Sequence, residues 1–259
     1  MKIIFIGAGN LATHLAQALK NAGHEIIQVY SRTRESAEML ATKVGAHCVT
    51  DIDKLCTDAD ACIMAVKDSA LEELISKACV ARPNIVFMHT AGSMPMSLFE
   101  NHAKSYGVLY PMQSFSKERA VDFAQIPCFL EWNGDRARIV ITRLAESVSD
   151  KHYEMNSDAR KHLHLAAVFA SNFVNHCYAL SAELLDKYDL PFDVMLPLTD
   201  EVARKVHEMT PTEAQTGPAV RYDENVMDKH KRMLDDEPLM KDIYEKMSES
   251  IHHTALKKQ

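Results

Sequence analysis

The first thirty residues constrain the fold of this chain most, because they read as a complete strand–turn–helix–strand unit. Residues 2–6 (KIIFI) form a short apolar run suited to a strand buried on both faces. Residues 7–12 (GAGNLA) fit the pattern G-x-G-x-x-G/A directly after that run. Apolar residues then recur at helical spacing until Gly23, and residues 25–30 form a second strand-like run. The segment therefore predicts half of a nucleotide-binding fold.

Each small residue of this glycine-rich turn has a physical role in holding a pyrophosphate. Gly7 permits the tight turn, Gly9 lets backbone amides approach phosphate oxygens, and a small residue at position 12 lets the helix pack on the strand. The helix start also offers unpaired N–H groups and the positive end of its dipole. A strand-to-helix turn without a ligand is the alternative. We predict cofactor contacts from five consecutive residues: Gly7, Ala8, Gly9, Asn10 and Leu11.

The segment after the second strand favours NADP(H) over NAD(H). An NAD site places Asp or Glu there to bind the ribose 2′-hydroxyl, and this chain has neither. It has Ser31, Arg32, Thr33 and Arg34, whose hydroxyl and guanidinium groups can hold a 2′-phosphate. The alternative is that both arginines are solvated charges on a loop. We predict that Ser31, Arg32 and Thr33 bind the cofactor.

Composition narrows the classes of partner. A net charge of -7 argues against nucleic acid, because no basic stripe is available to bind phosphates. No apolar run reaches the roughly 18 residues of a membrane span, and the apolar start of the chain is shorter than a signal peptide requires. The six cysteines form no C-x-x-C pair, as expected of reduced thiols. We therefore expect a cytoplasmic protein with a small-molecule substrate and neither a nucleic-acid nor a membrane partner.

Strands and helices alternate after residue 34, which predicts an α/β fold with a doubly wound sheet. Strand-like runs end near residue 156, and long helical patterns follow. We therefore expect a Rossmann-type domain over residues 1–156 and an all-α domain over residues 157–259. Ser157 is the expected cap of a first helix that reaches residue 187. Further strands are expected at residues 47–49, 61–66 and 84–89. Three more are expected at residues 107–110, 127–132 and 151–155, with their order left open and a partly antiparallel arrangement as one alternative.

In a doubly wound sheet, ligands bind over the carboxyl ends of the strands, so the loops after the strands are candidate binding segments. Val66 and Lys67 end one strand, and the turn from Thr90 to Ser93 follows the next. Its hydroxyls and free amides could contact a nicotinamide carboxamide or a substrate carboxylate, although such turns occur in loops of every kind. We predict cofactor contacts from Val66, Lys67 and Thr90, and substrate contacts from Gly92 and Ser93.

Several segments together resemble a known bacterial family: residues 7–12, 30–33, 89–93, 110–115, 164–172 and 216–218, with Arg221 and Asp223. Its members pair an N-terminal Rossmann-like domain with a C-terminal helical domain of unknown function, and are labelled NADP oxidoreductases. The chain is similar, more distantly, to pyrroline-5-carboxylate reductases, deazaflavin-dependent NADP reductases and β-hydroxyacid dehydrogenases. The resemblance implies a 6-phosphogluconate-dehydrogenase-like architecture, a homodimer formed through the helical domain, and an active-site cleft between domains.

Two polar residues share one face of the predicted long helix. His164 could donate a proton as hydride reaches the neighbouring atom, and Asn172 could orient the substrate through its amide. Both could instead be hydrogen-bonded core residues. The β-hydroxyacid dehydrogenases place a catalytic lysine four residues before such an asparagine, where this chain has Val168. No metal site is predicted, because His162 and His164 point to different faces of the helix.

The resulting hypothesis is an NADP(H)-dependent oxidoreductase that transfers hydride to or from a small carbonyl- or imine-containing metabolite. His164 and Asn172 are its predicted catalytic residues. Thr216 and Gly217 form a turn that could bind substrate in the cleft, or is only a turn between helices. The competing hypotheses are an NADP(H)-binding sensor without turnover and a Rossmann-like scaffold without a cofactor.

Overall fold

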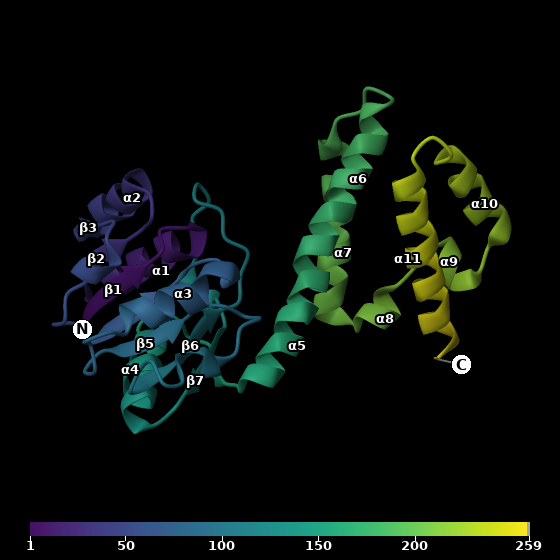
Figure 1. Ribbon diagram of the computed structural model, residues 1–259. Helices are drawn as coiled ribbons and strands as arrows, with labels where there is room; N and C mark the ends of the chain where they lie inside the picture. Colours follow the sequence, from purple (N-terminus) through teal and green to yellow (C-terminus); the bar gives the residue numbers. More distant parts are fainter. Residues whose placement is uncertain (258–259) are drawn as a thin grey trace. The chain divides into compact units, whose positions relative to one another are not determined.

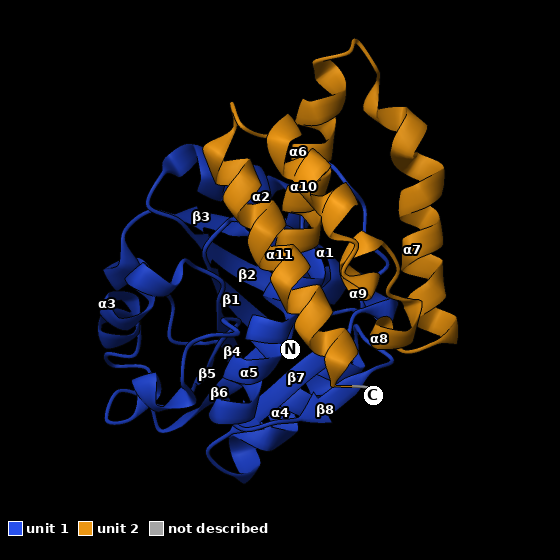
Figure 2. Ribbon diagram, turned by 90° about the vertical axis from the view of Figure 1, so that its right-hand side faces the viewer, with its two compact units in different colours: residues 1–172 blue, residues 173–259 orange. Residues whose placement is uncertain are grey.

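The chain folds into two compact units. The structure, a computed structural model, describes residues 1–257. One unit spans residues 1–172 and the other begins at Phe173 (Figure 2). The division lies within the long helix predicted from residue 157, whereas the change in sequence pattern falls at the start of that helix. The domain boundary at residues 156–157 therefore stays a prediction from sequence.

The first unit is built on an eight-stranded sheet with the order β3-β2-β1-β4-β5-β6-β7-β8 (Figure 1). The first six strands run parallel in the order 3-2-1-4-5-6, which is that of the doubly wound dinucleotide-binding fold. β7 is antiparallel to β6, and β8 is parallel to β7. The predicted α/β class with a Rossmann-type sheet is confirmed. The strands are β1 (Lys2–Ile6), β2 (Glu25–Tyr30), β3 (His47–Val49), β4 (Ala61–Met64), β5 (Val86–His89), β6 (Ser105–Pro111), β7 (Cys128–Trp132) and β8 (His152–Glu154).

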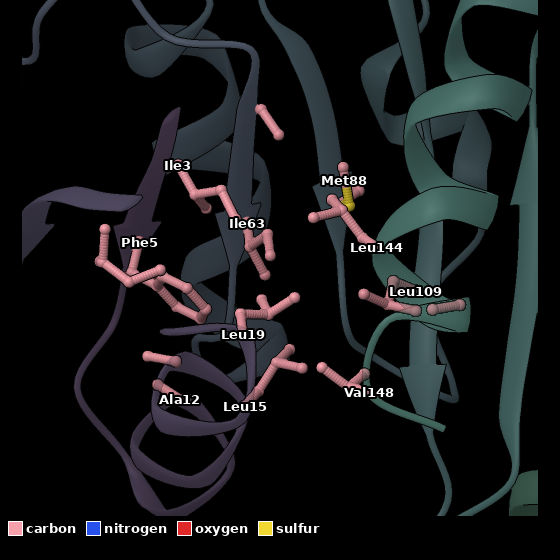
Figure 3. Close-up of a cluster of buried hydrophobic side chains, with 14 of the residues drawn as sticks. Ile3, Phe5, Ala12, Leu15, Leu19, Ile63, Met88, Leu109, Leu144 and Val148 are labelled. Atoms are coloured by element: carbon pink, nitrogen blue, oxygen red, sulfur yellow. The ribbon is translucent and has the colours of Figure 1, made fainter. Parts of the chain in front are cut away.

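Helices cover both faces of this sheet because its central strands are apolar on both sides. In β1, Ile3 and Phe5 belong to one core cluster and lie at its α1 side, whereas Leu144 of α4 lies beside Met88 of β5 (Figure 3). Ile4 and Ile6 join the cluster on the other face, which includes α3. All four of these β1 side chains are fully buried. The helices are α1 (Asn10–Asn21), α2 (Arg34–Val44), α3 (Asp68–Ala78) and α4 (Asp135–Glu146), with short 3₁₀ turns at Ile52–Lys54, Met96–Phe99 and Phe123–Gln125.

The long helix predicted from residue 157 is continuous but changes pitch midway. It consists of α5 (Ser157–Ala167), a π-helical segment (Val168–Phe173) and α6 (Val174–Asp186). The expected cap is wrong by one residue. The Asn156 side chain accepts from the backbone N–H of Ala159, while the Ser157 hydroxyl donates to the Glu131 carboxylate at 2.7 Å. Asn is as good a cap as Ser, so residue preference alone did not distinguish them.

The second unit is entirely helical over the residues that the structure describes. α11 packs against α9 and α10, and α7 packs against α8. No side chain of α6 or α7 is fully buried. No helix within residues 1–257 is long and apolar enough to cross a membrane. Beyond α6, the elements are a 3₁₀ turn (Phe192–Met195), α7 (Leu196–Glu208), α8 (Pro211–Ala214), α9 (Pro218–Arg221), α10 (Glu224–Met233) and α11 (Pro238–Leu256).

Candidate active site

The glycine-rich turn between β1 and α1 has the geometry of a pyrophosphate site. Gly7 has a φ of +107°, and a Cβ there would lie 2.1 Å from the carbonyl oxygen of Ala65. Gly9 is the N-cap of α1 and has open space where a Cβ would be, with no side chain capping the helix. The first N–H groups of α1 are therefore accessible to an anion. The turn fits a dinucleotide pyrophosphate.

A first cavity, of about 220 Å³, lies beside this turn at the ends of β1, β2 and β4. It brings together seven of the predicted cofactor residues: Gly7, Ala8, Gly9, Ser31, Arg32, Val66 and Lys67. The Arg32 side chain is exposed here, whereas Arg34 forms an ion pair with Glu38 at 3.0 Å. Thr33 does not line the cavity, and its hydroxyl donates to Ser36 Oγ at 2.9 Å. Of the two arginines, Arg32 lines the cavity and Arg34 does not, and a contact between Arg32 and a 2′-phosphate stays a prediction.

A second cavity, of about 350 Å³, continues from the first along the same edge of the sheet and shares Gly9, Val66 and Lys67 with it. It gathers the other predicted loop residues: Asn10, Leu11, Thr90, Gly92 and Ser93. Tyr110, from the end of β6, and His164, from α5, complete its lining. Predicted cofactor and substrate residues therefore meet in one cavity.

Three of these side chains are already engaged in holding the loops. The Asn10 amide donates to the carbonyl oxygen of Phe115 at 2.8 Å. The Thr90 hydroxyl donates to the carbonyl oxygen of Met64, and the Ser93 hydroxyl donates to the Asp68 carboxylate. Their contribution to the cavity is therefore mainly structural, and direct contact with cofactor or substrate stays a prediction.

Tyr110 and His164 form a hydrogen-bonded pair at the end of the second cavity. The Tyr110 hydroxyl lies 3.0 Å from Nδ1 of His164, and the two rings meet edge to face at 70°. Burial raises the pKa of Tyr110, so the phenol keeps its proton at neutral pH. Gly92 lies against both rings, since a Cβ there would be 2.6 Å from Nδ1 of His164. The pair is thus held in place by backbone contact.

A third cavity, of about 440 Å³, adjoins the second and shares Tyr110 and His164 with it. Half of its lining residues are aliphatic, and the cavity runs along α5 and the π-helical segment to Asn172. Both predicted catalytic residues therefore line this cavity. Asn172 is exposed, so the core role considered for it does not apply.

Buried polar groups support the loop that carries Gly92. Arg160 is fully buried, pairs with Glu131, and donates from Nη2 to the carbonyl oxygen of Met94 at 2.6 Å. At the other end of the loop, Nδ1 of His89 accepts from the backbone N–H of Ala91 at 3.2 Å. Burial, together with the charge of Arg160, lowers the pKa of His89 to about 3, so this ring is neutral.

The sequence analysis did not predict Tyr110 and Arg160 as residues of the candidate active site. Tyr110 ends a strand at the ligand-binding edge, and this position was a signal that could have identified it. Arg160 precedes His164 by one helical turn, but its burial depends on Glu131, which is distant in sequence.

Thr216 and Gly217 lie in the helical unit, so their predicted substrate contacts stay a prediction. Among residues 1–257, no group of three or more His, Cys, Asp or Glu side chains is placed to hold a metal ion.

A doubly wound sheet with a pyrophosphate-binding turn at its ligand edge is the fold of dinucleotide-binding proteins. The family models agree. Residues 2–87 match "NADP oxidoreductase coenzyme F420-dependent", and residues 126–251 match a domain of unknown function, DUF2520. A crystal structure of the provisionally assigned NADP oxidoreductase BF3122 from Bacteroides fragilis is 53% identical, with a TM-score of 0.93 over 97% of this chain and 98% of that one. The chain belongs to this NADP oxidoreductase family, and its cofactor is NADP(H).

Two more distant structures share the fold. An imine reductase from Myxococcus stipitatus, solved with NADP⁺, is 17% identical with a TM-score of 0.67, over 100% of this chain and 95% of that one. A pyrroline-5-carboxylate reductase from Coxiella burnetii is 17% identical with a TM-score of 0.59, over 98% and 97%. Among curated proteins, none matches the sequence.

Proposed function

We propose that this oxidoreductase uses NADPH to reduce a C=N or C=O bond of a small metabolite. The observation that carries the proposal is the Tyr110–His164 hydrogen bond of 3.0 Å, which lies where the second and third cavities meet. Bound NADPH would supply the hydride. A substrate in the third cavity would then present its nitrogen or oxygen to the pair. The imine and pyrroline reductases that share the fold support a reductive direction.

In the proposed reaction, the side chains supply one proton. Hydride adds to the substrate carbon, the π electrons move to nitrogen or oxygen, and that atom takes the proton of the Tyr110 hydroxyl. The phenolate takes a proton from Nδ1 of His164, which is within hydrogen-bond distance, while Nε2 of the same ring takes up a proton from solvent, so that no imidazolate forms. Asn172, in the same cavity, orients the substrate through its amide.

The interdomain cleft, the homodimer and the cytoplasmic location belong to the same proposal. The dimer is supported by apolar side chains that the second unit leaves exposed on α6 and α7, among them Leu184, Leu198, Val202 and Val206. Light scattering should give twice the chain mass at micromolar concentration. A monomer with full activity would contradict the dimer. Loss of activity in Gly217→Val with unchanged NADPH affinity would support the cleft.

Turnover and cofactor binding must be measured separately to test the function. We expect Tyr110→Phe and His164→Ala to reduce the rate of NADPH oxidation with imine or carbonyl substrates by about a hundredfold or more. Calorimetry should show nearly unchanged NADPH affinity for both variants. If the wild-type protein binds NADPH but does not oxidise it with any compound of a broad substrate panel, the result favours the NADP(H)-binding sensor without turnover over the enzyme.

A further inference from the structure

The third cavity is the space into which the non-reacting part of a substrate would extend. It begins at the Tyr110–His164 pair and follows the helix to Asn172, in a volume of about 440 Å³. Its contents therefore determine which substituents the reacting carbon can carry. This inference rests on the proposed reductase function.

The side chains that line the third cavity are apolar or uncharged polar groups, apart from the imidazole of His164. Six of its side chains are aliphatic: Met112, Leu163, Ala166, Ala167, Val168 and Ala170. Apart from Tyr110 and His164, the polar lining residues carry only hydroxyl or amide groups, and none of the described lining residues is Asp, Glu, Lys or Arg. A carboxylate or phosphate in this space would meet no Lys or Arg side chain to compensate for the water that it gives up.

The cations nearest in sequence do not line the cavity. Lys117, three residues after Ser114, lines a separate cavity beside α1. Arg160 precedes His164 by one turn, but its side chain is fully buried and bound to Glu131 and to the carbonyl oxygen of Met94. Lys161 does not line the cavity, and its amine lies 3.4 Å from the Asp158 carboxylate. Neither can neutralise an anion in the third cavity without breaking these contacts.

The helix that lines the cavity is shaped to leave room for apolar bulk. Ala166, Ala167 and Ala170 project only methyl groups into it. The backbone also changes from α to π geometry at Val168, so the facing side chains depart from ordinary helical spacing. π turns of this kind are frequent at functional sites.

We propose that the substrate carries an uncharged, apolar substituent on its C=N or C=O carbon, and that imino and keto acids are discriminated against. The substrate class is thus a hydrophobic imine or ketone. NADPH is oxidised to NADP⁺ as the bond is reduced to an amine or alcohol, with the proton taken from Tyr110 as described above.

A matched pair of cyclic imines tests the proposal. 2-Phenyl-1-pyrroline and 1-pyrroline-2-carboxylate have the same ring and reacting carbon and differ in the substituent. We expect kcat/KM to be at least about tenfold higher for the phenyl compound, because a carboxylate in the third cavity has no Lys or Arg partner there. Equal values, or a preference for the carboxylate, would overturn the proposal.

Product binding separates failure of this proposal from failure of the proposed function. Calorimetry of the NADP⁺ complex with 2-phenylpyrrolidine and with proline requires no turnover. Tighter binding of 2-phenylpyrrolidine supports the apolar cavity even if neither imine is reduced, in which case only the reductase proposal fails. Equal binding, tighter binding of proline, or no binding of either compound rejects the apolar cavity.

A charge introduced into the cavity should reverse the preference. Val168→Lys places an amine on the lining, and the phenyl-to-carboxylate ratio of kcat/KM should fall about tenfold or more. Ala159→Lys adds the same charge at an exposed position of the same helix outside the cavity, and should leave the ratio unchanged. Ser171→Lys, at an exposed lining position, repeats the test if Val168→Lys does not fold. An unchanged ratio in a folded lining variant contradicts the proposal.

Discussion

Gly92 and His164 approach so closely that no larger residue fits between the loop after β5 and the helix α5. A Cβ at Gly92 would lie 2.6 Å from Nδ1 and 2.8 Å from Cγ of the imidazole. The same atom would lie 2.8 Å from Cζ of Tyr110. The backbone at Gly92 thus fixes the positions of both rings, and with them the path of the proton.

Gly92→Ala should therefore lower activity without unfolding the protein. The added methyl group must displace the imidazole or the phenol, and a displacement of about 1 Å costs on the order of a hundredfold in rate. We expect kcat to fall by about that factor while NADPH affinity stays within about threefold. Gly134→Ala is the matched control, since a Cβ there meets nothing within 4 Å. Full activity in Gly92→Ala would mean that the rings can move freely.

Arg32 should account for the preference for NADPH over NADH. Its side chain is exposed in the first cavity, and charge-assisted hydrogen bonds to a 2′-phosphate are worth roughly 1.5–3 kcal/mol. Arg32→Ala should weaken NADPH binding by about ten- to a hundredfold and leave NADH binding nearly unchanged. Arg34→Ala, whose side chain pairs with Glu38, should change neither affinity. Equal loss for both nucleotides in Arg32→Ala would remove Arg32 from the 2′-phosphate site.

The buried ring of His89 should make the protein less stable in mild acid. Because the folded pKa of about 3 lies below the ordinary value near 6.5, the unfolded state binds the proton more readily. The neutral ring of His89 therefore makes its full contribution to the free energy of unfolding above about pH 6.5. This contribution decreases as the pH falls toward 3, and at pH 5 it has decreased by roughly 2 kcal/mol. Urea unfolding of the wild type and of His89→Gln at pH 7 and pH 5 measures it. The wild type should lose more stability than the variant, and equal losses would contradict this origin.

Arg160 and Glu131 should be coupled in stability. Removing one partner leaves the other charged and poorly solvated, which costs about 3–5 kcal/mol. The double variant Arg160→Met with Glu131→Gln removes both charges. We expect it to be less destabilised than the sum of the two single variants, by about 1–3 kcal/mol in urea unfolding. Additive losses would indicate that the ion pair contributes nothing.

Local patterns were sufficient to predict most of the fold. The run of apolar residues in β1 and the glycines after it specify a buried strand and a phosphate-binding turn, and both are present. The positions of the later strands followed from the same alternation. Whether β7 runs parallel or antiparallel was left open, because direction is set by pairing between strands rather than by any single segment.

Only those site residues whose position follows from a single segment of the sequence could be predicted. Gly9 and Arg32 follow strands that the sequence identifies, so their cavities could be anticipated. The pairing of Tyr110 with His164 could not, because it requires the end of β6 and the first turns of α5 to be brought together. The π-helical segment before Asn172 has no signature in the hydrophobic pattern.

The central claim is that Tyr110 and His164 deliver the proton as one unit, and a double-mutant cycle tests it most directly. NADPH oxidation would be followed with 2-phenyl-1-pyrroline, or another imine that the wild type reduces, for Tyr110→Phe, His164→Ala and the double variant, at saturating NADPH. Groups that act together are strongly non-additive, so the double variant should lose about as much kcat as the worse single variant. Losses that multiply, or a single variant that keeps wild-type kcat, would contradict the account.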